Sequence, residues 1–182
     1  MKKIKTLLAL ALAACLALTV LTGCGGETAD SEETDTRKYG AAASDSVVLP
    51  EGMDSTARFA TQQTDGALYV VFNGIQNRDT GYFSVPGGQI TFTMQTTGES
   101  PSIKYVKVAV WKKVAAGTQY VEGTTVYFAV TGEPASYTIT GLDPAEAYRL
   151  TVSYDSASYY AYGTLRVDGA AELGSGVEED VA

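Results

Sequence analysis

The chain has 182 residues, 45% of them hydrophobic, and a formal net charge of −8 at pH 7. It contains no histidine, which excludes Ser-His-Asp and Cys-His catalytic groups and histidine-ligated zinc sites. The acidic charge disfavours nucleic acid and anionic lipid head groups as partners.

The first 23 residues have the pattern of an export signal. Lys2, Lys3 and Lys5 form a positive start, and residues 7–21 follow without a charge. An apolar run of about 15 residues is shorter than the roughly 20 that span a bilayer, and it suits the apolar centre of a signal peptide. We therefore predict a signal peptide over residues 1–23.

The stretch Leu21-Thr22-Gly23-Cys24 resembles the lipobox of bacterial lipoproteins. The resemblance implies cleavage just before Cys24, acylation of that cysteine, and a lipid anchor in the cell membrane on the side away from the cytoplasm. The alternative is an ordinary secretory signal, or an uncleaved membrane helix, with Cys24 incidental. The only other cysteine, Cys15, would leave with the signal, so the exported part would contain no disulfide.

Residues 24–46 are expected to form a flexible, disordered tether between the lipid and a folded domain. They are acidic and small, with Tyr39 as the single aromatic residue and no hydrophobic period. Such a segment buries too little apolar surface to offset its ordering entropy. Without the three lysines of the signal, 10 Lys and Arg remain against 21 Asp and Glu, a net charge of −11. Residues 169–182 are expected to form a similar acidic tail.

Residues 47–168 are the one candidate domain. Apolar and polar residues alternate there in short segments separated by turn residues, and no window has a helical apolar period. Alternation with enrichment in Val, Thr and Tyr predicts an all-β antiparallel sandwich or barrel. The expected strands are 58–63, 68–75, 82–85, 89–96, 103–114, 119–121, 125–130, 137–140, 147–154 and 159–167.

The run from Tyr137 to Val152 resembles the region around the E–F corner of fibronectin type III and related immunoglobulin-like domains. Leu142, Pro144 and Tyr148 occupy the positions of that motif, and alternating aliphatic residues follow. The resemblance implies a single immunoglobulin-like sandwich in which the Tyr148 hydroxyl bonds to upstream backbone. It also implies that the strands 103–114, 147–154 and 159–167 are neighbours in one sheet.

The residues expected to face outward on these three strands form a candidate binding face. Val106, Val108 and Val110 alternate toward the core, so the residues between and beside them face outward. Aromatic rings beside hydrogen-bonding groups suit stacking on sugar rings or anchoring of a protein partner. The alternative is that cross-strand pairs merely stabilise a solvated sheet. The candidate ligand-binding residues are Tyr105, Trp111, Tyr160 and Tyr162, with Lys107, Arg149 and Arg166 among them.

The sequence favours a protein without catalytic activity, cofactor or metal. Most carboxylates of the domain fall in predicted turns, and none has a recognisable metal-ligand spacing. The leading hypothesis is a cell-surface lipoprotein that serves as a binding or adhesion module for an extracellular glycan or protein. A structural or accessory subunit of a cell-envelope complex is the alternative, and a carboxylate-dependent hydrolase is disfavoured.

Overall fold

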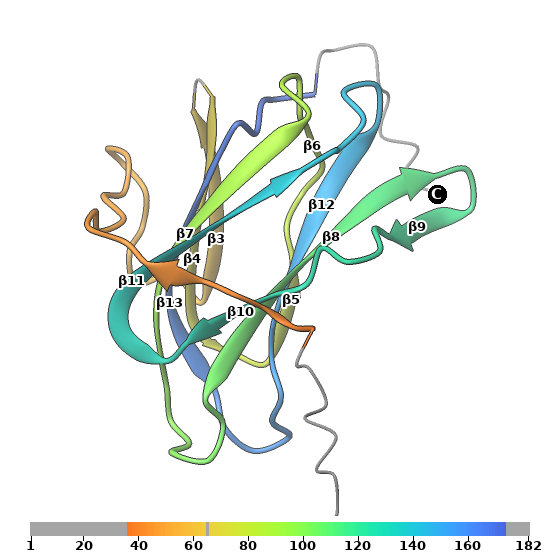
Figure 1. The fold of residues 1–182 in the computed structure, drawn as a ribbon. Coiled ribbons are helices and arrows are strands. Elements are labelled where there is room, and N and C mark those ends of the chain that lie inside the picture. Colours follow the sequence, from red (N-terminus) through yellow and green to blue (C-terminus); the bar gives the residue numbers. More distant parts are fainter. Residues whose placement is uncertain (1–35, 65, 174–182) are drawn as a thin grey trace, which may run out of the picture. The chain divides into compact units, whose positions relative to one another are not determined.

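A computed structural model of the protein describes residues 36–64 and 66–173, and every regular element in these ranges is a strand (Figure 1). The expected signal peptide, Cys24, the tether up to residue 35 and the tail from residue 174 lie outside the described residues. Two sheets of mostly antiparallel strands pack face to face, which confirms the prediction of an all-β sandwich. Within the described ranges, no helix could cross a membrane.

The first sheet, called sheet A, has seven strands. Its main order is β1-β10-β8-β12-β5, with β6 on β12 and β9 on β8. The strands are β1 (Lys38–Tyr39), β5 (Asn77–Asp79), β6 (Phe83–Ser84), β8 (Tyr105–Val114), β9 (Gly117–Tyr120), β10 (Val126–Ala129) and β12 (Ala147–Tyr154).

The second sheet, called sheet B, has six strands in the order β2-β11-β7-β13-β4-β3. The strands are β2 (Ala41–Ala42), β3 (Phe59–Thr64), β4 (Ala67–Ile75), β7 (Gln89–Gly98), β11 (Thr131–Thr140) and β13 (Ala161–Asp168).

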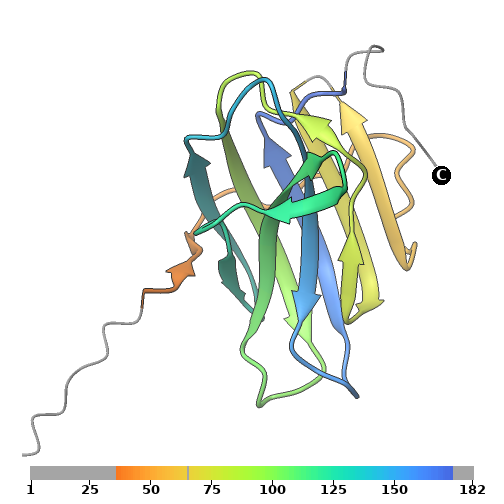
Figure 2. The same cartoon turned by 90° about the vertical axis from the view of Figure 1, so that its right-hand side faces the viewer.

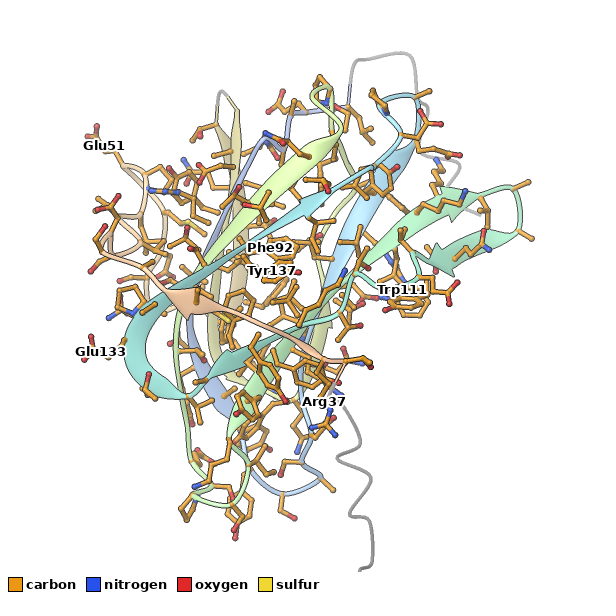
Figure 3. All side chains as sticks on the ribbon, in the orientation of Figure 1. Arg37, Glu51, Phe92, Trp111, Glu133 and Tyr137 are labelled. Atoms are coloured by element: carbon orange, nitrogen blue, oxygen red, sulfur yellow. The ribbon has the colours of Figure 1, made fainter. Side chains whose placement is uncertain are left out.

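The core lies between the sheets and follows the alternation of the sequence. Val106, Val108 and Val110 of β8 are fully buried, and Phe92 of β7 faces them from sheet B. The Phe92 ring meets the edge of Phe128 with 6.4 Å between ring centroids. Figure 3 shows Phe92 in the space between the sheets. Burial of this apolar surface is the main favourable contribution to folding.

The corner before β12 has the expected hydrogen bonds. The Tyr148 hydroxyl accepts from the Asp143 amide at 2.7 Å and donates to the Asp143 carbonyl at 3.1 Å. The side chain is only 2% exposed, and this burial raises the pKa of the Tyr148 hydroxyl. The prediction that Tyr148 ties the corner to upstream backbone is confirmed.

One predicted neighbourhood is wrong. The last strand, β13, lies in sheet B between β4 and β7, whereas the immunoglobulin-like order placed it beside β12. Alternation tells which side chains of a strand face the core, but it does not identify the partner strand. Gly163 fits the observed place, because a Cβ there would lie 2.3 Å from the Gln95 carbonyl oxygen of β7.

The packed unit extends beyond residues 47–168 at both ends. Lys38–Tyr39 pairs in parallel with β10 of sheet A, and Ala41–Ala42 pairs with β11 of sheet B. Gly40 between them lies so close to Phe128 that a Cβ would approach its ring to 2.7 Å. At the other end, Ala170 is fully buried. These contacts use backbone groups and small residues, so composition alone did not reveal them.

Candidate functional site

A segment of the chain crosses the outer face of sheet B. Residues 43–58 connect β2 to β3, which are at opposite edges of the sheet, about 24 Å apart at the usual strand spacing. We call residues 43–58 the strap. The Asn73 side-chain amide of β4 donates to the strap at the carbonyls of Ser55 (3.0 Å) and Ala57 (2.8 Å). Figure 3 shows Glu51 of the strap and Trp111 of sheet A on opposite sides of the sandwich.

Two outward side chains of sheet B are buried on the face that the strap crosses. Val71 and Thr93 point away from the core by alternation, yet they are only 1% and 4% exposed. The space that remains is a hollow of about 430 Å³ lined by Val47 and Leu49 of the strap together with Tyr162 and other residues of the sheet.

The outer face of sheet A, which Figure 2 turns toward the viewer, is crossed by no strap among the described residues. We call it the open face. Five residues of β8 point outward in succession, and each is partly exposed. They are Tyr105, Lys107, Ala109, Trp111 and Lys113.

Three tyrosines gather at one end of the open face. The ring of Tyr39 in β1 lies 5.2 Å from Tyr105 and 5.7 Å from Tyr127, centroid to centroid, and Tyr105 meets Tyr127 edge-on at 6.1 Å. The Arg37 guanidinium lies 5.6 Å from the centre of the Tyr127 ring. We call these residues the tyrosine cluster. Pairs of this geometry contribute about 0.5–1.5 kcal/mol beyond area burial.

A second aromatic group, the tryptophan cluster, lies about 20 Å further along β8, since each residue of a strand advances the chain by about 3.3 Å. Trp111 packs edge-on against Tyr120, its cross-strand partner in β9, with 5.5 Å between centroids. Tyr82 belongs to the same cluster, because Lys113 and Arg149 lie over its ring at 5.7 and 6.0 Å. The tryptophan cluster consists of Tyr82, Trp111, Lys113, Tyr120 and Arg149.

Tyr120 is held in place at its hydroxyl. The Thr125 amide donates to it at 3.3 Å, and the two hydroxyl oxygens lie 3.0 Å apart. Burial alone would raise the pKa of the Tyr120 hydroxyl, but its hydrogen bonds with Thr125 and Thr124 lower it. Ala109 and its cross-strand partner Thr151 lie between the two clusters. Both have small side chains, which project less from the sheet than the aromatic rings on either side.

Two donors of the tryptophan cluster have no acceptor. Trp111 Nε1 and Arg149 Nε are buried, and no described residue accepts a hydrogen bond from either. The two residues are direct cross-strand partners. An unsatisfied buried donor lowers the free energy of unfolding by about 1–3 kcal/mol. The two donors at this position of the open face therefore reduce the stability of the protein.

The structure brings together only two of the four predicted site residues. Tyr105 and Trp111 share the open face, with Lys107 and Arg149. Tyr162 lies on β13, where its hydroxyl donates to Glu99 at 2.5 Å and the pKa of Tyr162 is raised by that bond. Tyr160 precedes β13 in a loop and is 36% exposed. The four-residue face is wrong because β13 and Arg166 belong to sheet B.

Sequence reasoning missed four tyrosines of the open face. Tyr127 could have been found, because it alternates with the buried Val126 and Phe128. Tyr120 could have been found from its place in a hairpin with β8. Tyr39 carried no signal, since it lies in a segment with the composition of a tether. The fourth is Tyr82.

No protein-family model and no curated protein matches the chain. Among solved structures, it is similar to carbohydrate-binding modules of the β-sandwich superfamily, with a TM-score of 0.34, 14% identity, and coverage of 59% of this chain and 46% of that one. It is also similar to a CBM4 structure (TM-score 0.34, 12% identity, 62% and 75% covered). A third is the N-terminal cellulose-binding domain of a Cellulomonas fimi β-1,4-glucanase (TM-score 0.31, 19% identity, 65% and 84% covered). The chain spans less than half of the first structure, and likenesses of this degree carry no conclusion about its ligand.

Proposed function

We propose that the protein is a non-catalytic glycan-binding module and that the open face of sheet A is its binding surface. The observation that carries the proposal is the presence of two aromatic clusters on one sheet face that no described segment crosses. Tyr105 and Trp111 project from the same strand, about 20 Å apart, with Ala109 between them. Rings of this kind stack on the apolar faces of sugars, and neighbouring Lys, Arg and Thr groups offer hydrogen bonds.

The geometry suits an extended ligand. A molecule that lies along β8 would contact the tryptophan cluster, pass over Ala109 and Thr151, and reach the tyrosine cluster. Two linked contacts on one ligand bind more tightly than either alone. The affinity is therefore expected to rise with the length of the oligosaccharide until both clusters are filled.

Affinity electrophoresis of the purified protein in a panel of polysaccharides tests the proposal. Trp111→Ala and Tyr105→Ala are each expected to weaken binding by about 2 kcal/mol or more, the usual size of a binding hot spot. Tyr159→Ala is the matched control, because Tyr159 is exposed but lies in the loop before β13. Retardation that survives both cluster variants would contradict the proposal, and capture of a protein instead of a glycan would favour the adhesion alternative.

We also propose that the module is held at the cell surface by a lipid on Cys24. The support is the stretch Leu21-Thr22-Gly23-Cys24 after a basic start and an apolar run. Metabolic labelling with a radioactive fatty acid should mark the wild-type protein, and Cys24→Ser should be unlabelled and poorly processed. Equal label in both would rule out the anchor without affecting the proposal for the open face.

A further inference from the structure

Trp111 and Arg149 each carry a buried donor for which no described residue supplies an acceptor. They are cross-strand partners on β8 and β12, so their Cβ atoms lie about 5 Å apart. Both the indole Nε1–H and the guanidinium Nε–H are buried and unpaired among the described residues. Buried polar groups are nearly always hydrogen-bonded, and each exception calls for an explanation. Two exceptions at one register position point to a shared ligand atom or group.

The surroundings fix both donors in place. Arg149 Nη2 forms an ion pair with Asp79 at 3.0 Å and lies 3.4 Å from the Thr118 hydroxyl, so these contacts hold the guanidinium through Nη2. The Trp111 ring is held against Tyr120, which is itself tied to Thr125. Donors that are already oriented lose little entropy when an acceptor arrives.

The charge of the site selects the acceptor. A guanidinium binds a carboxylate through short, charge-assisted hydrogen bonds that are about twice as strong as neutral ones. Lys113 lies over the same Tyr82 ring as Arg149, so this part of the open face holds two cations beside the carboxylate of Asp79. Resting on the proposed glycan-binding function, we propose that Trp111 and Arg149 together bind the carboxylate of an acidic sugar, of the uronic acid class.

Strand β9 lies beside the two donors, with Tyr120 against the Trp111 ring and the Thr118 hydroxyl near Arg149. Among the described strands, β9 pairs only with β8, and three of its four residues are exposed. Tyr120 at its end is 36% exposed. A sugar that displaces the edge of the Tyr120 ring would reach Trp111 Nε1–H and Arg149 Nε–H without disturbing the core.

Trp111 is the only tryptophan in the chain, so a ¹H–¹⁵N spectrum of the ¹⁵N-labelled full-length protein in detergent contains a single indole N–H signal. We would titrate the protein with oligogalacturonate and with the same oligosaccharide after reduction of its carboxyl groups. The acidic form should move the indole proton downfield and protect it from exchange. It should also bind at least about tenfold more tightly than the reduced form, the effect of one hydrogen bond to a charged group.

Two conservative variants separate donation from stacking. Trp111→Phe keeps an aromatic ring and removes the N–H, whereas Arg149→Lys keeps the charge and removes the planar donor edge. Each should lower the ratio of the affinity for the acidic form to the affinity for the reduced form by about tenfold. A change in stacking alone would alter both affinities and leave this ratio unchanged. Fingerprint spectra of the variants that match the wild type outside this cluster show that the fold is intact.

The two proposals fail in different ways. If wild type binds acidic and reduced oligosaccharides equally, or Trp111→Phe keeps the preference, the carboxylate site is overturned and the stacking surface remains. If wild type binds no glycan in the polysaccharide panel or in this titration, the proposed function falls and the carboxylate site falls with it.

Discussion

The two outer faces of the sandwich start from the same alternating pattern and have different surroundings. On sheet B, the outward residues Val71 and Thr93 are almost completely buried, and the strap crosses this face from one edge to the other. On sheet A, Tyr105 and Trp111 occupy equivalent outward positions and remain partly exposed. Alternation places a side chain on a face, but the path of the connecting segments decides whether solvent or a ligand can reach it.

The comparison also concerns what each face can bind. The contacts of the strap with sheet B include hydrogen bonds from the Asn73 and Gln62 side chains to strap carbonyls. The open face offers rings and cations instead. One face therefore binds a segment of its own chain, and the other has the chemistry for a ligand that is not part of the chain.

The largest expected effect on stability comes from a carboxylate placed on the outer face of sheet B, compared with the same change on the open face. Val71→Asp would leave an unpaired carboxylate under the strap and should lower the free energy of unfolding by about 3–5 kcal/mol. Ala109→Asp, the matched change on the open face, should cost no more than about 1 kcal/mol, the range of strand propensities. Urea melts measure both. Similar losses would show that the strap does not exclude water from Val71 in solution.

The next largest effect is expected at Tyr148, a buried residue of β12. Tyr148→Ala should cost about 3–5 kcal/mol through the cavity it leaves. Tyr148→Phe should cost about 1–2 kcal/mol, because the hydrogen bonds with Asp143 are lost. Unchanged midpoints in urea for both variants would mean that the corner is not packed.

The same hydroxyl gives a dependence on pH. Since burial raises the pKa of Tyr148 above its value in the unfolded chain, its contribution is fully present below pH about 10. It is lost as the pH rises through the higher folded-state pKa. Tyr148→Phe should therefore lose less stability at alkaline pH than the wild type, and a wild-type curve that parallels the variant would contradict this assignment.

These contrasts show what the sequence could and could not predict. The faces of β8 and the corner at Tyr148 were predictable because each depends on local alternation or on a short motif. The place of β13 and the pairing of Tyr39 were not, because both depend on contacts between residues far apart in the chain. The binding face was predicted on the correct strand, β8, but Tyr162 belongs to sheet B and Tyr160 to the loop before β13.

Removal of the N-terminal strands tests whether Tyr39 belongs to the open face. A protein that starts at Val47 lacks β1 and β2, whereas one that starts at Thr36 keeps them. Loss of the two ring contacts of Tyr39 should lower the free energy of unfolding by about 1–3 kcal/mol. Tyr39→Ala in the longer protein separates the ring from the strand. Equal stability of all three proteins would show that residues 36–46 do not contribute to the folded domain and serve only as a tether.

The smallest effect on stability is expected at the residue with the largest expected effect on binding. Trp111 lies on the outer side of β8, and among the described residues its ring contacts one aromatic residue, Tyr120. Trp111→Ala should therefore cost about 0.5–1.5 kcal/mol of stability, well below the cost at Tyr148, and at least about 2 kcal/mol of binding free energy. Tyr120→Ala is the matched variant, since it removes the same contact from the other side. Fluorescence of the single tryptophan reports the same arrangement: quenching by iodide should be partial in the wild type and complete in Tyr120→Ala. A stability loss of about 3–5 kcal/mol for Trp111→Ala, with quenching absent in both proteins, would place Trp111 in the core and remove it from the open face.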